Sequence, residues 1–325
     1  MACCRCGDGT LTPAGIMTDH IHPKGEWMAS YSFMNMTMKG NREGFNTLSD
    51  AAVNEQYMMI PQTMNMQMHM VMLMYGLTDR LTLMAMGGYN TASMNMYMPG
   101  MSMPGMTMSS SSMSSTSSGL ADTKLYGLYQ LYDKGTIRVI GSLGISLPTG
   151  SIKANGITML GANQRLPYDM QPGTGSFAIL PDVTFIMSRG NVEGGVEVGG
   201  NANLNYNQLG YRAMNSYHST FWASYRFLKF LSASYRGEYV VTSGISGQDP
   251  AMSIQFYQQA DQTTNTANYG GSSVNNYLGL NFHLPAGPLS HFTLQAEYGI
   301  PLSQYANGVQ MSVRGMGIAA LQYKF

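Results

Sequence analysis

The chain has 325 residues, of which only 10% are charged, with 17 Lys and Arg balanced by 17 Asp and Glu. Soluble domains usually carry about a quarter charged residues, and nucleic-acid-binding proteins need a basic face, so the composition argues against both classes. No stretch approaches the roughly 18 consecutive apolar residues of a membrane helix, so any membrane crossing must be made by strands of a closed barrel.

Residues 1–24 are expected to precede the strands as a periplasmic N-terminal segment, and they lack the basic and apolar regions of a secretory signal. The segment holds three cysteines and two histidines, namely Cys3, Cys4, Cys6, His20 and His22. Thiolate and imidazole are ligands for copper or zinc. In an oxidising periplasm, two of the thiols can instead form a disulfide, and a cysteine at a mature N-terminus can carry lipid. Metal binding, a disulfide, a lipid anchor and the absence of any specific role are therefore all open alternatives for these residues.

From residue 25 to residue 325, apolar and polar residues alternate with a period of two in twelve segments, which is typical of transmembrane strands. They lie near residues 25–38, 64–76, 81–98, 119–133, 136–147, 175–188, 191–206, 213–228, 230–243, 272–284, 291–300 and 310–325. The predicted fold is all-β, a transmembrane antiparallel β-barrel of about twelve strands. The strands of a soluble β-sandwich also alternate between apolar and polar residues, but such a fold does not need twelve long strands.

Every second connection between these segments is short. The compact turns lie at residues 76–80, 133–135, 188–191, 228–229 and 285–288, whereas the long polar connections include 39–63, 99–118, 148–174 and 244–271. Bacterial barrels have short periplasmic turns and long extracellular loops. We therefore expect a bacterial outer-membrane protein with both termini in the periplasm, surrounded by lipid and lipopolysaccharide, and with a Met/Ser-rich extracellular loop at 99–118.

The chain ends on an alternating strand whose last residue is Phe325. A C-terminal aromatic residue on such a strand resembles the recognition element of the barrel assembly machinery, which is therefore an expected partner.

Charged residues of both signs fall on the inward face of the predicted strands. The expected lumen-lining residues are Lys124, Arg138, Asp182, Glu193, Glu197, Arg226, Arg236, Glu238, Glu297 and Arg314. One interpretation is a polar pore that selects weakly by charge. The other is a set of salt bridges that fill the lumen, because a barrel of twelve strands is narrow.

Methionine is the most distinctive residue of the chain, with 31 copies concentrated in its first third. The alternation places three strands' methionines inside the barrel, and the candidate metal ligands among them are Met34, Met36, Met64, Met66, Met68, Met70, Met72, Met84 and Met86. Thioethers are soft ligands that select Cu(I), so copper is the candidate metal, although no cofactor is required. The alternative is that methionine serves as flexible apolar filler.

Four ordered segments resemble the phenol-degradation-pathway (MetA-type) family of outer-membrane transporters. They are residues 20–27 (HIHPKGEW), 77–84 (LTDRLTLM), 146–150 (SLPTG) and 172–176 (PGTGS). The resemblance runs from about residue 14 to the end and implies a barrel for small solutes, of a methionine- and histidine-rich branch associated with metals. Family members often carry an acidic residue after the SLPTG element, where this chain has Ser151.

Two functional hypotheses follow. The first is a transporter or channel for a small solute, associated with copper through its methionine-rich lumen and loop. The second is a closed structural barrel that acts as a scaffold or docks partners at the outer membrane. The sequence contains no Gly-x-Ser-x-Gly element and no phosphate loop, so we do not expect an enzyme.

Overall fold

The computed structural model describes residues 11–103, 106–283, 287 and 290–325, and it confirms the all-β fold. The strands of the main sheet are β1 (Trp27–Gly44), β2 (Asn46–Leu48), β3 (Ile60–Thr78), β4 (Leu81–Met98), β7 (Ser111–Leu120), β8 (Thr123–Asp133), β9 (Ile137–Leu147), β12 (Ala178–Arg189), β13 (Val192–Asn203), β15 (Ser216–Leu228), β16 (Leu231–Thr242), β18 (Gly271–His283) and β19 (Phe292–Lys324). None of the described helices is long and apolar enough to cross a membrane.

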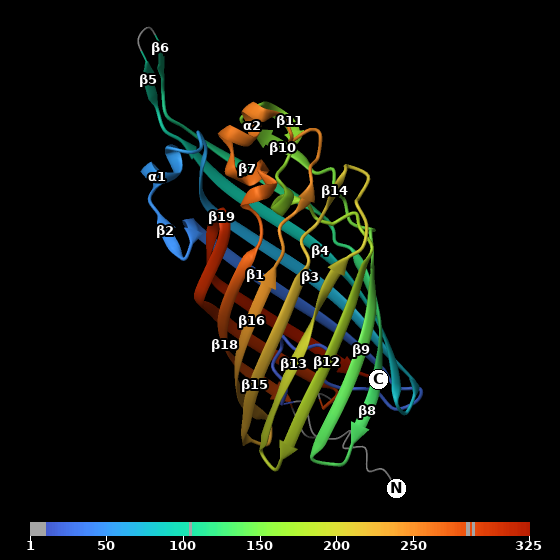
Figure 1. Ribbon diagram of the computed structural model, residues 1–325. Coiled ribbons are helices and arrows are strands. Elements are labelled where there is room, and N and C mark those ends of the chain that lie inside the picture. The colour runs from blue at the N-terminus through green and yellow to red at the C-terminus, as the bar shows by residue number, and fades with distance from the viewer. Residues whose placement is uncertain (1–10, 104–105, 284–286, 288–289) are drawn as a thin grey trace.

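Within the described residues, eleven of these strands close into a barrel, because β19 pairs back onto β1 (Figure 1). All neighbouring strands of the wall are antiparallel. A ring of antiparallel strands closes only when the number of crossings is even, so one of the eleven strands, β19, must cross the wall twice. Residues 293–306 of β19 pair with β18, whereas residues 306–324 pair with β1. The backbone N–H of Lys324 donates to His291 O (3.1 Å), which shows that the two parts of β19 lie side by side. The predicted strands at 291–300 and 310–325 are thus one continuous element, and the wall has twelve crossings.

The outer face of the wall is apolar, as alternation requires of a barrel in lipid. Val71, Leu143 and Leu278 point outward and are 55%, 63% and 70% exposed, whereas Thr82 and Thr184 on the opposite face are fully buried. Such a belt of exposed apolar side chains is stable only in contact with lipid.

The strands β1, β3 and β4 are longer than the other strands that cross the wall once. β1, β3 and β4 have 18 or 19 residues, and β8 and β9 have 11. The turn-side part of β4 pairs with β8, and its remaining part, Tyr89–Met98, pairs with β7. The predicted loop at 99–118 is therefore largely strand, because β7 satisfies the backbone groups of β4 that extend beyond β8.

The long connections lie at one end of the barrel, and the β5–β6 hairpin projects away from it (Figure 1). Their elements are α1 (Asp50–Asn54), β5 (Met101–Met103), β6 (Met106–Met108), β10 (Asn155–Thr158), β11 (Gly161–Arg165), η1 (Tyr168–Met170), β14 (Tyr211–Arg212), β17 (Ser246–Gly247), α2 (Gln255–Ala260), η2 (Gln262–Thr264) and η3 (Thr266–Asn268). The short turns lie at the other end, where Phe325 N donates to Trp27 O (3.0 Å).

Residues 11–24, which we call the lumen segment, lie inside the barrel and not ahead of it. Thr12 Oγ1 donates to Glu193 (2.8 Å), Gly15 N donates to Glu297 (2.6 Å), and Thr18 Oγ1 donates to Glu197 (2.7 Å). Residues 11–24 of the N-terminal segment expected at 1–24 therefore lie against lumen side chains, and the periplasmic position of this segment stays a prediction. The physical reason is that polar lumen side chains satisfy the hydrogen-bonding groups of this irregular segment. Cys3, Cys4 and Cys6 lie outside the described residues.

Candidate functional site in the barrel lumen

The lumen has two chemically different sides. On one side, the methionines of β1, β3 and β4 share the inward face and form what we call the methionine wall. Its members are Met28, Met34, Met36 and Met38 of β1, Met64, Met66, Met68, Met70, Met72 and Met74 of β3, and Met84, Met86, Met94, Met96 and Met98 of β4; all are buried or half-buried. Alternation puts them there, since the residues between them form the outer face.

Strand register brings these methionines into rows that run across the wall. Met28 pairs with Met74, and Met74 pairs with Met84 on its other side. Met36 lies between Met66 of β3 and Met316 of β19. Residues directly opposite each other have Cβ atoms about 4.5–5.5 Å apart, so each row presents neighbouring thioethers.

Two inserted parts of the chain pack against the methionine wall. At the short-turn end, Ile16 of the lumen segment joins a buried cluster with Met72, Met74 and Met86. At the loop end, Leu166 and Met170 join a second cluster with Met64, Met94 and Met96. The wall is thus partly an ordinary apolar core, which is the role of methionine as filler.

Between the inserted parts, a cavity of about 150 Å³ remains open against the methionine wall. Its methionine lining consists of Met34, Met36, Met66, Met68, Met170 and Met316. Asp169 also faces this cavity, and its Oδ1 atom is buried without a hydrogen-bond partner. Burial and the neighbouring Asp261 carboxyl raise the pKa of Asp169 to about 7. Thioethers and one carboxyl group therefore converge on the same open space.

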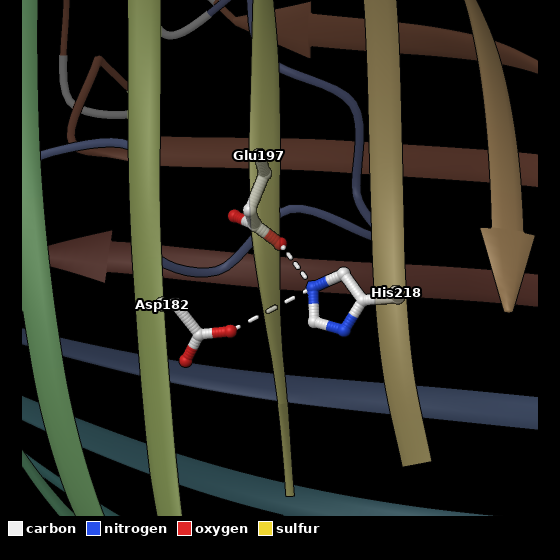
Figure 2. A group of neighbouring side chains, drawn as sticks. All are labelled: Asp182, Glu197 and His218. Atoms are coloured by element: carbon white, nitrogen blue, oxygen red, sulfur yellow. Dashed lines mark hydrogen bonds and ion pairs between the residues drawn. The ribbon is translucent and has the colours of Figure 1, made fainter. Parts of the chain in front are cut away.

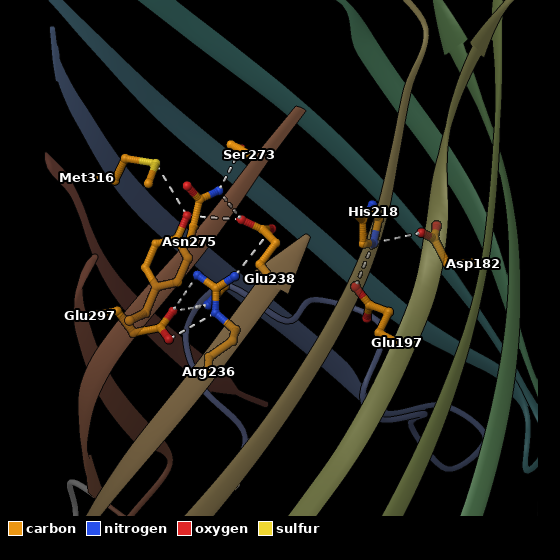
Figure 3. Close-up of polar contacts among 11 residues, drawn as sticks. Asp182, Glu197, His218, Arg236, Glu238, Ser273, Asn275, Glu297 and Met316 are labelled. Carbon is orange, nitrogen blue, oxygen red and sulfur yellow. Dashed lines mark hydrogen bonds and ion pairs between the residues drawn. The ribbon is translucent and has the colours of Figure 1, made fainter. Parts of the chain in front are cut away.

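The other side of the lumen, which we call the polar wall, consists of charged residues on β12 to β19. At its centre, Arg236 Nε donates to Glu297 (3.1 Å), and its guanidinium lies 3.6 Å from the centroid of the Tyr277 ring. Glu238 accepts from Tyr277 Oη (3.1 Å) and from Asn275 (3.2 Å). Figure 3 shows Arg236, Glu238, Asn275 and Glu297 joined in one network, so these buried charges are paired with one another.

A second polar cluster joins Asp182, Glu197 and His218 from β12, β13 and β15 (Figure 2). His218 Nε2 lies 3.1 Å from Glu197 Oε1 and 3.6 Å from Asp182 Oδ1. The donor atoms are close enough to hold a metal ion. However, Glu197 Oε2 already accepts from Thr18 (2.7 Å) and Thr184 (3.2 Å). The cluster is satisfied without a cation, and it docks the lumen segment.

The lumen segment itself brings His20 and His22 to the methionine wall. His20 Nδ1 lies 2.6 Å from Asp19 Oδ1, and His22 Nδ1 lies 2.8 Å from Glu26 Oε1. The Nε2 atom of each ring is buried without a hydrogen-bond partner. Both rings therefore keep one nitrogen available for a ligand.

Most of the predicted lumen charges lie in the polar wall. Arg138 pairs with Glu193 (3.2 Å), and Lys124 lines a second cavity of about 290 Å³ with Asp122. Arg226 faces inward near the short turns and is half-buried. Arg314 differs: it is exposed at a register shift of β19 and donates to Lys39 O (3.0 Å), so it does not join the network.

Sequence reasoning missed several residues of the lumen, among them His218 and Asp169. His218 shares the inward parity of Thr220 and Trp222 on β15, so alternation could have identified it. Asp169 lies in an irregular connection, where no periodic pattern reveals its position.

No family model and no curated protein matches the chain, so membership of the phenol-degradation-pathway family stays a prediction. Among solved structures, an outer membrane channel from Pseudomonas putida F1 is similar with a TM-score of 0.61 at 12% identity, covering 95% of this chain and 99% of that chain. The KdgM porin has a TM-score of 0.42 at 8% identity, covering 91% and 99%. The NanC porin has a TM-score of 0.42 at 8% identity, covering 90% and 100%. At these identities the similarity shows the fold alone.

Proposed function

We propose that this chain is an outer-membrane barrel of a Gram-negative bacterium that binds Cu(I) along its methionine wall and lets this small solute enter the lumen. In this proposal the short turns and both termini face the periplasm. The observation that carries it is the convergence of thioethers from the adjacent strands β3, β1 and β19 on one lumen face, around an open cavity.

The cavity distinguishes a metal-binding role of the methionines from a role as apolar filler. Where methionine acts only as filler, neighbouring side chains should close the space to the usual packing density of a protein interior. Met34, Met66 and Met68 instead border about 150 Å³ of free volume. Thioether sulfur is a soft ligand that favours Cu(I) over hard cations such as Mg²⁺. The buried Asp169 carboxyl group adds a site that can balance the positive charge of the ion.

The test is a Cu(I) titration of the purified barrel against a chromophoric Cu(I) chelator. Replacing Met34, Met66 and Met68 together by Leu preserves apolar volume at a modest cost in stability but removes three soft ligands. We expect this variant to lose at least one equivalent of bound Cu(I). The matched control is Met187→Leu, because Met187 lies on the lipid face and is 56% exposed. Equal stoichiometry in all three proteins would overturn the copper assignment.

The structure also favours a second candidate, a closed barrel that serves as a scaffold. The lumen segment and the connection around Leu166 both fill space inside the wall. Conductance in planar bilayers separates the candidates when the wild-type chain is compared with a variant that lacks residues 1–24. A channel gated by the lumen segment conducts after this deletion, whereas a scaffold closed along its length stays silent in both forms.

A further inference from the structure

His20 and His22 are held side by side inside the barrel. Their side chains are 10% and 1% exposed, and their ring centroids are 5.0 Å apart in an edge-to-face arrangement. The backbone N–H of His22 donates to Thr82 Oγ1 (2.8 Å), which fastens the lumen segment to β4 near the short turns. The two imidazoles are therefore fixed against the wall.

The carboxylates of Asp19 and Glu26 determine which nitrogen of each ring is available. They lie within hydrogen-bond distance of the Nδ1 atoms of His20 and His22, respectively. A carboxylate accepts hydrogen bonds, so Nδ1 of each neutral ring carries the proton and Nε2 holds a lone pair. Carboxylate–imidazole pairs of this kind orient metal-binding histidines and increase the basicity of the ligating nitrogen.

Both Nε2 atoms are buried and have no hydrogen-bond partner. Leaving a buried polar atom unpaired is energetically unfavourable, and such atoms are few in native proteins. Two of them on adjacent rings therefore call for a common explanation. A cation bound between the two rings would satisfy both lone pairs.

The surroundings of His20 favour a soft cation. A cavity of about 10 Å³ adjoins His20, and Met70, Met72 and Met86 also line it. A volume of that size accommodates one particle about as large as a water molecule. Imidazole and thioether donors together match Cu(I) better than hard divalent cations, which prefer carboxylate, carbonyl and water oxygens.

We infer that His20 and His22 bind one Cu(I) ion through their Nε2 atoms, with thioether ligands from Met70, Met72 or Met86. This ion fastens the lumen segment to the methionine wall. The inference rests on the proposed function for the identity of the metal, but it names a separate site for it.

The experiment uses the full chain in detergent with Ag(I), an air-stable substitute for Cu(I). In ¹⁵N NMR of the histidine-labelled wild-type protein, we expect Ag(I) to shift the Nε2 resonances of His20 and His22 at one equivalent. In hydrogen exchange, we expect Ag(I) to slow the amides of residues 11–24 at least tenfold. The double variant His20→Gln and His22→Gln should lose one equivalent and this protection, whereas the control His291→Gln, at an exposed position, should keep both.

Three results would overturn the inference. They are unshifted Nε2 resonances in the wild-type protein, unchanged stoichiometry in the double variant, and Zn²⁺ shifting these resonances when Ag(I) does not. The NMR result does not depend on whether the variant folds. The Met34, Met66 and Met68 variant separates the two proposals. If it binds as much Ag(I) as wild type while the histidine variant does not, the proposed function fails at the cavity of about 150 Å³ and the histidine site stands.

Discussion

At the scale of single residues, Gly15 determines how closely the lumen segment approaches the polar wall. Its N–H donates to Glu297 Oε2 (2.6 Å), and a Cβ atom at this position would overlap the Arg236 guanidinium. Arg236 cannot easily yield, since its side chain is 3% exposed and paired with Glu297. Glycine is therefore required at position 15, because a side chain there would collide with the Arg236 guanidinium.

We expect Gly15→Ala to release the lumen segment without unfolding the barrel. Loss of a hydrogen bond to a charged acceptor costs about 1.5–3 kcal/mol, so amides of residues 11–19 should exchange roughly 10- to 100-fold faster. Hydrogen exchange measures this change. Gly87→Ala is the control, because a Cβ on Gly87 meets nothing within 4 Å. Equal exchange in both variants would show that the close approach to Arg236 does not hold the segment.

Asp169 should make the loop end of the barrel sensitive to pH. Burial and the Asp261 carboxyl raise the pKa of Asp169 from 3.8 to about 7, so the folded state binds a proton more tightly than the unfolded state. The stabilisation from this group is complete below pH 3.8 and is lost as the pH rises through about 7. Tyr269 and Asp261 are the other titratable groups near it.

We therefore expect residues 155–172 to resist proteolysis better at pH 5 than at pH 8, and Asp169→Asn to remove most of this difference. Limited proteolysis at both pH values, with a protease active at each, provides the measurement. The cleavage of a distant short turn at Gly190 serves as the internal control. A pH dependence that persists in Asp169→Asn would assign the effect to another group.

At the scale of elements, the strands of the wall could be predicted because lipid and lumen impose a period of two on each crossing independently. The lumen segment could not, since its partners are remote in sequence: Thr12 and Glu193 are 181 positions apart, and Gly15 and Glu297 are 282 apart. The strand β7 was missed for a different reason. Its serine-rich sequence shows no apolar alternation, and it forms because β4 extends beyond β8.

The methionines show the same difference between what sequence alternation predicts and what only the structure reveals. Alternation alone places Met64 to Met74 on one face of β3, and the structure finds that face turned inward. It does not reveal that Asp169 from a distant connection reaches the cavity beside Met66 and Met68. Periodicity predicts which face of its strand a residue occupies, whereas the fold of the connections determines which residues it contacts there.

The end of β19 supports a prediction on assembly. Phe325 is 71% exposed, and its ring packs on Tyr323 with centroids 4.8 Å apart. If the aromatic terminus is read by the assembly machinery, Phe325→Ala should lower the amount of barrel in the outer membrane several-fold while leaving refolding in detergent unchanged. Heat-modifiable gel mobility of both samples measures this. Phe45→Ala, at a position 68% exposed near the loop end, is the control, and a matching loss in detergent would indicate a folding defect instead.

At the scale of the whole molecule, the lumen combines an apolar, thioether-rich side with a side of paired charges, and the lumen segment bridges them. Ile16 packs on the methionine wall, while Thr12 and Thr18 bond to the polar wall. Removal of the segment therefore exposes both surfaces to water at once. This is why one deletion can distinguish a gated channel from a barrel that is closed along its length.

The unequal strand lengths have a consequence for where the methionines stand relative to lipid. All strands of the barrel wall must cross the bilayer, so β8 and β9, with 11 residues each, fix its position near the short turns. A tilted strand needs about 9–11 residues to span the hydrocarbon, so β3 and β4 extend beyond it by about 8 residues, or roughly 25 Å of strand length. Met64, Met94 and Met96 lie in that projecting part. The methionine wall therefore begins above the membrane surface, where Met64, Met94 and Met96 pack against Leu166 and Met170 and tie the loop connections to the projecting strands.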